Sequence, residues 1–223
     1  MKTIRIGCAS AAVCLFLLSS PALSQTTTAP QPSSRTHVYL VRGLMNVFSL
    51  GLDSIADKLR HRGINATVHN HLEWIALTDE AIQACKSGRE NQIILVGHSL
   101  GATAVVDMAQ RFSQAGVQAS LLVSLDPVTR VSANGNVHRL VNYYISNGVG
   151  QPIDRGTGFH GSLQNVDLKN NPEGGHIFLT NSEAMQQKVY NDVLAGISTH
   201  IGCHSGGATH AAYGTSTAKP PGS

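Results

Sequence analysis

The sequence predicts an α/β fold, in which a mostly parallel sheet is covered by helices on both faces. Short apolar runs of strand length alternate along the chain with segments whose apolar residues recur at helical spacing. The apolar runs are nearly continuous rather than alternating, which is typical of strands buried on both faces. With 223 residues, 42% of them hydrophobic, the chain has enough apolar material for the core of one domain.

The elements follow one another in the order that such a sheet requires. Strands are expected at His37–Val41, Ala66–Asn70, Gln92–Val96, Ser120–Leu125, Arg139–Ile145 and Leu163–Leu168. Helices are expected at about Leu50–Leu59, Ala76–Lys86, Leu100–Ser113 and Glu183–Ile197. Gly63 and Gly88 follow the first two helices, where a glycine commonly ends a helix.

Both ends of the chain differ in composition from this central part. Lys2 and Arg5 flank the start of a short apolar stretch that ends before the small residues Ala22-Leu23-Ser24, which is the pattern of a secretory signal peptide over residues 1–24. Residues 25–35 read as a flexible leader, 36–197 as the folded domain and 198–223 as a low-complexity tail. We therefore expect a secreted or periplasmic protein with no stable membrane anchor after signal cleavage.

Charge and cysteine content narrow the classes of partner. Only 13% of residues are charged and the net charge is +3, which argues against a nucleic-acid partner. Signal cleavage leaves two cysteines, Cys85 and Cys203, which form either one disulfide or two free thiols. The cluster His200, Cys203, His204 and His210 lacks a recognised ligand spacing, so no metal is expected.

A candidate nucleophile follows the most apolar strand. Gly97-His98-Ser99-Leu100-Gly101 matches the G-x-S-x-G elbow, a tight turn between strand and helix that lifts a serine above the sheet. Five letters are a weak signal by themselves, and the inert alternative is a glycine-rich structural turn. The position between a predicted strand and a predicted helix makes Ser99 the candidate nucleophile.

A serine hydroxyl needs a general base and an acid that orients the base. The expected chain order on this fold is serine, acid, histidine. Asp126 directly follows a predicted strand, and His176 follows the last predicted strand on a loop before the final helix. The nearest alternatives are Asp154 and Asp167 for the acid and His160 for the base, and we expect His98 to brace the elbow.

Backbone N–H groups must meet the oxyanion that develops during acyl transfer. One is expected from Leu100, the residue after the nucleophile, and a second from the loop after the first strand. In that loop either Gly43 or Leu44 can supply it, and the sequence leaves both open.

These motifs resemble one family. Gly97-His98-Ser99-Leu100-Gly101-Ala102, Ser124-Leu125-Asp126-Pro127 and Gly175-His176 are similar to motifs of the lipase, esterase and thioesterase branch of the α/β-hydrolase superfamily, over roughly residues 36 to 197. The chain would be a small member without a cap domain. It departs from the branch at Arg42, where many members carry histidine, and at Ile145-Ser146-Asn147, which lacks the acid found there in other branches.

The resemblance implies a secreted serine hydrolase. It would cleave carboxylic esters or thioesters through a Ser-His-Asp triad and an acyl-enzyme, without metal or organic cofactor, and its partner would be a small acyl-bearing ester, thioester or lipid. Two alternatives stay open. An acyltransferase would use the same triad, and a noncatalytic binding module would keep the scaffold without the chemistry.

Overall fold

The computed structural model describes residues 35–44, 49–170 and 175–204. The expected signal peptide, all of the leader except Arg35, and the tail beyond His204 lie outside these residues. Six strands form the main sheet: β1 (Thr36–Arg42), β2 (Asn65–Asn70), β3 (Gln92–His98), β4 (Ala119–Leu125), β6 (Val137–Tyr144) and β8 (Ser162–Asp167). Four helices accompany it: α1 (Gly51–Arg60), α2 (Trp74–Lys86), α3 (Leu100–Ala115) and α4 (Glu183–Ser198).

The sheet is parallel throughout and its strand order is β2-β1-β3-β4-β6-β8. From β1 the chain moves outward to β2, then returns to the other side of β1 to form β3 and continues in the opposite direction. The strand order therefore reverses between β1 and β3. In open α/β sheets, sites form outside the carboxyl ends of the strands at such a reversal.

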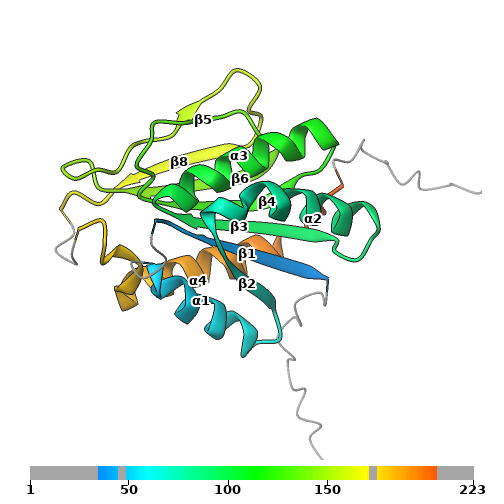
Figure 1. Cartoon of the computed structure of the whole chain (residues 1–223), viewed down its shortest axis with the longest axis horizontal. Helices are drawn as coiled ribbons and strands as arrows, with labels where there is room; N and C mark the ends of the chain where they lie inside the picture. Colours follow the sequence, from blue (N-terminus) through cyan, green and yellow to red (C-terminus); the bar gives the residue numbers. More distant parts are fainter. Residues whose placement is uncertain (1–34, 45–48, 171–174, 205–223) are drawn as a thin grey trace, which may run out of the picture. The chain divides into compact units, whose positions relative to one another are not determined.

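Helices cover both faces of the sheet, as expected. Figure 1 shows α2 and α3 on one face and α1 and α4 on the other. The two apolar cores agree with this arrangement, because Ile82 and Phe112 pack with Leu95 on one face, whereas Leu52 and Val189 pack with Val96 on the other. Successive residues of β3 therefore point into different cores. Among the described helices, none has the length and apolarity needed to cross a bilayer.

Local sequence explains where the helices begin and end. Asp53 lies in the first turn of α1, and Lys58 and Arg60 lie in its last turn, so all three complement the helix dipole. Ser182 begins α4 by accepting the Met185 N–H with its hydroxyl. Short elements that the sequence pattern did not predict are η2 (His71–Glu73), β5 (Ser132–Ala133), β7 (Asp154–Arg155) and η3 (Leu179–Asn181).

The domain boundary expected at residue 197 is too early. Helix α4 continues to Ser198, and the segment after it lies against the starts of β3 and β4. The Cys203 N–H donates to the Asn91 carbonyl, the Cys203 carbonyl accepts the Gln118 N–H, and Cys203 forms a disulfide with Cys85. The low apolar content of this segment misled the prediction, because backbone hydrogen bonds and a covalent bond hold it rather than apolar burial.

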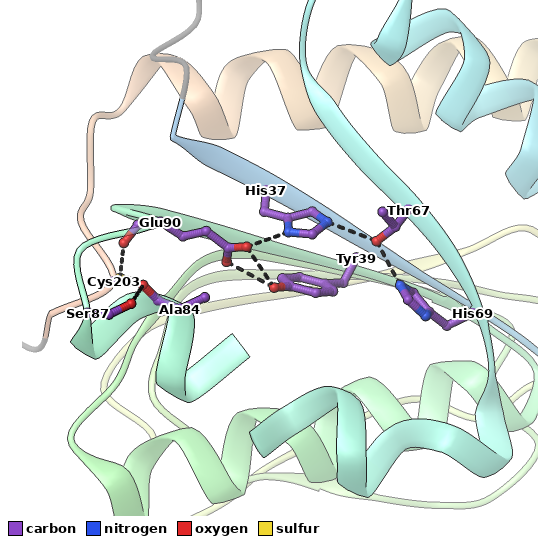
Figure 2. Close-up of polar contacts among 8 residues, drawn as sticks. All are labelled: His37, Tyr39, Thr67, His69, Ala84, Ser87, Glu90 and Cys203. Atoms are coloured by element: carbon purple, nitrogen blue, oxygen red, sulfur yellow. Dashed lines mark hydrogen bonds and ion pairs between the residues drawn. The ribbon is translucent and has the colours of Figure 1, made fainter. Parts of the chain in front are cut away.

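A buried polar cluster lies beside this disulfide, toward the amino ends of β1 and β3 (Figure 2). The Glu90 carboxylate accepts the Tyr39 hydroxyl at 2.9 and 3.0 Å and contacts His37 Nδ1 at 2.5 Å. Thr67 lies 2.9 Å from His37 Nε2 and 2.7 Å from His69 Nε2. Burial, followed by the neighbouring Glu90 charge, raises the pKa of Tyr39. The cluster therefore gives the buried polar side chains of β1 hydrogen-bonding partners.

Candidate active site

Ser99 lies in a strained turn between β3 and α3. Its backbone has φ 61° and ψ −123°, a conformation that costs an L-residue free energy and that surrounding contacts must enforce. Glycines on both sides make these contacts possible. A Cβ at Gly97 would lie 2.3 Å from the Gly101 carbonyl oxygen, and a Cβ at Gly101 would lie 2.1 Å from the Val41 carbonyl oxygen. The strand and the helix can approach this closely only with glycine at both positions.

The structure brings Ser99, His176 and Asp126 together. His176 Nε2 lies 2.9 Å from Ser99 Oγ, and His176 Nδ1 lies 2.7 Å from Asp126 Oδ2. A carboxylate only accepts, so Nδ1 carries a proton and Nε2 is free to accept one from the serine hydroxyl. This arrangement can deprotonate Ser99 as the hydroxyl attacks an electrophile.

Asp126 is held rigidly at the end of β4. It is fully buried, has φ 52°, and its second oxygen, Oδ1, accepts the Ile145 N–H at 2.7 Å. The Asp126 N–H in turn donates to the Tyr143 carbonyl. The carboxylate therefore presents one fixed oxygen to His176.

The alternative acids and base lie elsewhere. Asp154 pairs with Arg130, and Asp167 accepts the Ser146 hydroxyl, so each carboxylate is engaged away from His176. The Arg130 partnership lowers the pKa of Asp154, and the Ser146 hydrogen bond lowers that of Asp167. His160 lines a separate polar cavity of about 290 Å³ near the start of β6. None of the three is among the residues that line the cavity at Ser99.

Gly43 approaches the nucleophile more closely than any other residue type could. A Cβ on it would lie 2.7 Å from Ser99 Cβ and 3.0 Å from the His98 carbonyl oxygen. Its own N–H points to the Ser49 hydroxyl at 3.2 Å. Leu44 and Leu100 line the same cavity as Ser99. As the first residue of α3, Leu100 has an N–H without an intrahelical acceptor.

His98 braces the elbow, as the sequence predicted, but its partners were not foreseen. Its Nδ1 lies 2.8 Å from Ser49 Oγ and its Nε2 lies 3.0 Å from the His176 carbonyl oxygen. Burial, together with the nearby His176, lowers the pKa of His98 to about 4. Ser49 was missed because a single serine in a loop has no sequence signal of its own. Arg42, the departure from the family pattern, pairs with Asp53 of α1.

A cavity of about 510 Å³ opens over Ser99, large enough for a small ligand. Its lining comes from five segments and carries no lysine, arginine, aspartate or glutamate among the described residues. Leu44, Val149 and Ile177 line it with exposed fractions of 57%, 51% and 40%, so apolar surface continues from the cavity to solvent.

Within residues 35–204, as far as the structure describes them, the cysteine and histidine side chains form no free thiolate site. Cys85, Cys203 and His204 place ligand-type atoms within 4.8 Å of one another. The two sulfurs are joined in the disulfide, however, and a metal would need them as thiolates. The sequence cluster also included His200 and His210. His210 lies outside the described residues.

Comparison with known proteins gives one family. The serine hydrolase family model matches residues 56–143, which include the elbow and Asp126. No curated protein sequence matches the chain at a significant level.

Solved structures of low sequence identity are similar to parts of the chain. A hydrolase of the α/β superfamily from Xanthomonas campestris pv. campestris is 12% identical, with a TM-score of 0.41, covering 71% of this chain and 98% of that one. A cutinase-like protein from Cryptococcus sp. is 16% identical, with a TM-score of 0.43 and coverages of 73% and 95%. The type II thioesterase BorB from the borrelidin biosynthetic cluster is 12% identical, with a TM-score of 0.46 and coverages of 78% and 94%.

A parallel sheet with helices on both faces and a serine elbow after its central strand defines the class to which this site belongs. These features are those of an α/β fold, and over residues 56–143 the chain is similar to the serine hydrolase family.

Proposed function

We propose that the protein is a serine hydrolase that cleaves neutral carboxylic esters with an apolar acyl group, using Ser99 as nucleophile, His176 as general base and Asp126 as the acid that orients it. The observation that carries the proposal is the pair of hydrogen bonds from His176, 2.9 Å to Ser99 Oγ and 2.7 Å to Asp126 Oδ2. A hydrogen-bonded set of this geometry is how serine hydroxyls become nucleophilic near neutral pH.

The reaction proceeds in two halves. Ser99 Oγ attacks the acyl carbon while its proton passes to His176 Nε2, and the carbonyl oxygen becomes an oxyanion next to the backbone of the elbow. The intermediate collapses, the alcohol leaves with the proton from His176, and an acyl-enzyme remains. Water then attacks the acyl carbon and gives a proton to His176 Nε2. The bond between the acyl carbon and Ser99 Oγ breaks, Ser99 Oγ takes the proton back from His176, and the carboxylic acid leaves.

The lining of the cavity favours neutral esters. A carboxylate or phosphate near the scissile bond would lose its hydration against the side chains of Leu44, Val149 and Ile177 without finding a cationic partner among the described lining residues. The His176 side chain is 23% exposed, which leaves water access to the acyl-enzyme and favours hydrolysis over transfer. Thioesters with a neutral leaving group use the same chemistry and are the second substrate class.

Ser99→Ala tests the nucleophile. A fluorophosphonate probe should label the wild-type protein and should not label the variant, because the probe forms its bond with an activated serine oxygen. Ser120→Ala is the matched control, since Ser120 is also buried and hydrogen-bonded but lies within β4. Equal labelling of Ser99→Ala and wild type would overturn the proposal.

Turnover of a graded ester series tests the substrate class. We expect kcat/KM to rise from 4-nitrophenyl acetate to the butanoate and octanoate, by up to roughly fourfold for each methylene that becomes buried, since burial contributes about 0.8 kcal/mol per CH₂. The 4-nitrophenyl monoester of succinate should be far slower than the butanoate. A succinate monoester turned over as fast as the butanoate would contradict the preference for neutral acyl groups.

We also propose that the protein acts outside the cytoplasm. The signal-peptide pattern of residues 1–24 supports this, and so does the Cys85–Cys203 disulfide, because such bonds persist in oxidising compartments. The full chain expressed in a bacterial host should appear in the periplasm or medium with Gln25 as its first residue. Cytoplasmic protein that retains Met1 would contradict the proposal.

A further inference from the structure

A line of hydrogen bonds runs beneath Ser99 and joins the two loops on either side of it. The Gly43 N–H donates to Ser49 Oγ at 3.2 Å, and Ser49 Oγ lies 2.8 Å from His98 Nδ1. On the other side of the ring, His98 Nε2 lies 3.0 Å from the His176 carbonyl oxygen. The line thus starts in the loop after β1 and ends at the backbone of the candidate base.

The chemistry of the groups determines which atom carries each proton. A carbonyl oxygen only accepts, so His98 Nε2 must be the protonated nitrogen. Because burial keeps the pKa of His98 near 4, the ring is neutral at pH 7 and Nδ1 is an acceptor. Ser49 therefore donates its hydroxyl proton to Nδ1, and its oxygen is left to accept the Gly43 N–H. Each donor in the line has one acceptor.

This direction of the hydrogen bonds resolves which amide can bind an oxyanion. The Gly43 N–H is already engaged by Ser49, so it is not available to a substrate oxygen. Leu44, the next residue, lines the cavity beside Ser99 and Leu100. The second amide of the oxyanion hole is therefore that of Leu44, and Gly43 serves as the residue without a side chain that brings the loop close to Ser99.

We propose that Ser49 and His98 are positioning residues that hold Gly43 and Leu44, which follow β1, and the backbone of His176 at a fixed separation across Ser99. The amides of Leu44 and Leu100 are the oxyanion donors. This inference rests on the proposed function. Neither Ser49 nor His98 touches the reacting atoms, and both act through backbone groups of other residues.

Both loops need such support because their surface is exposed. Leu44 is 57% exposed, and Ile177 and Phe178, which follow His176, are 40% and 60% exposed, so apolar burial holds little of these described residues. Ser49 and His98, in contrast, are 0% and 1% exposed. A buried hydrogen-bonded pair between two exposed loops can hold both in the geometry that the transition state requires.

Ser49→Ala tests the proposal, with Ser120→Ala as the matched control because it also removes a fully buried serine hydroxyl. We expect kcat/KM for 4-nitrophenyl butanoate to fall by about 10- to 100-fold in Ser49→Ala, less than the 100- to 1000-fold typical of losing an oxyanion donor outright. Binding of butylboronic acid, which forms a tetrahedral adduct with the serine, should weaken in proportion. Binding of the unreactive 4-nitrophenyl butyl ether should stay within twofold.

His98 variants complete the experiment. His98→Leu should resemble Ser49→Ala, and the double variant should be little worse than either single one, because both break the same line. His98→Gln keeps one donor and one acceptor and should recover part of the activity.

The possible failures are distinguishable. If Ser99→Ala is as active as wild type, the proposed function fails. If Ser99→Ala is inactive but Ser49→Ala keeps kcat/KM within twofold, only the positioning proposal fails. Equal weakening of boronate and ether binding, or multiplicative losses in the double variant, would also overturn it, since both indicate a general structural role.

Discussion

At the scale of single residues, backbone strain coincides with the candidate chemistry. Outside glycine, the described residues with positive φ are Ser99, Asp126 and His200. Two of these three are the candidate nucleophile and acid, each at the carboxyl end of neighbouring strands β3 and β4. Such conformations persist only where surrounding contacts enforce them. Here the close approach of Gly97 to Gly101 and the bond from the Ile145 N–H to Asp126 provide those contacts.

Asp126→Asn should lower kcat by about 10⁴-fold. An asparagine amide facing His176 Nδ1 favours the tautomer that carries its proton on Nε2, and this tautomer cannot accept the serine proton. Steady-state hydrolysis of 4-nitrophenyl butanoate measures the loss. Asp167→Asn is the control and should stay within twofold of wild type. A loss of less than tenfold for Asp126→Asn would remove Asp126 from the proposed triad.

The burial of His98 predicts a pH dependence of stability. Its pKa is about 4 in the folded protein and near the ordinary 6.5 in the unfolded chain. Between these values the unfolded chain binds a proton that the folded protein does not, so stability is complete above pH 6.5 and declines as the pH falls toward 4. The decline from this residue is about 3 kcal/mol at most. Desolvation of the half-buried His69 lowers its pKa and acts in the same direction.

Urea unfolding of wild type and His98→Gln at pH 7 and pH 5 tests this. The variant should be less stable at pH 7 but should lose less stability between the two pH values. His160→Gln, which replaces an exposed histidine, should lose as much as wild type. Equal losses in His98→Gln and wild type would refute the assignment of this pH dependence to His98.

At the scale of elements, the sequence predicted the strands and helices whose hydrophobic pattern is local. The strand before Ser99 and the helix after it were expected within two residues of β3 and α3, because apolar runs and helical spacing are local signals. The candidate acid and base, Asp126 and His176, followed from the chain order expected on this fold. The proposed choice of Leu44 over Gly43 did not, because it rests on the contact between Ser49 and His98, which lie 49 residues apart.

The Cys85–Cys203 disulfide could not be predicted for the same reason, because it joins distant parts of the chain. Cys85 and Cys203 are separated by 118 residues, and sequence alone left bridge and free thiols equally open. Their proximity follows from two docked elements: α2, which packs in the apolar core, and the segment after α4, which is held by backbone hydrogen bonds that any residue type can make. Long-range pairing of this kind leaves no periodic trace in the sequence.

Loss of this disulfide should lower stability without slowing catalysis. A bond that closes a loop of this length contributes about 2 to 5 kcal/mol, largely by restricting the unfolded chain. We therefore expect the Cys85→Ala/Cys203→Ala variant to lose stability of this size in urea unfolding, with kcat within twofold of wild type. Addition of reductant should destabilise wild type but not the variant. A parallel loss of kcat at temperatures where the variant is folded would contradict the prediction.

At the scale of the whole molecule, the carboxyl ends and the amino ends of the parallel strands carry different features. The carboxyl ends of β1, β3 and β4 hold the cavity, Ser99 and Asp126, with strained backbone and exposed apolar loops. The amino ends hold the Cys85–Cys203 disulfide and the buried cluster around Glu90 (Figure 2). The net charge of +3 is small, so long-range steering of a substrate contributes little, and selection falls to the cavity itself.

This separation predicts that Glu90 matters for stability but not for turnover. Glu90 is 6% exposed and accepts hydrogen bonds from Tyr39 and His37, so Glu90→Ala leaves buried donors without an acceptor and should cost about 3 to 5 kcal/mol. Glu90→Gln retains an acceptor and should cost less. Glu183→Ala, which removes an exposed partner of Lys58, should cost at most about 1 kcal/mol.

Urea unfolding and kcat, measured on the same preparations, provide the test. Because the cluster lies at the amino ends of the strands and Ser99 at their carboxyl ends, kcat should stay within twofold in all three variants. A Glu90→Ala protein that is fully folded but slow would show that the two ends are coupled.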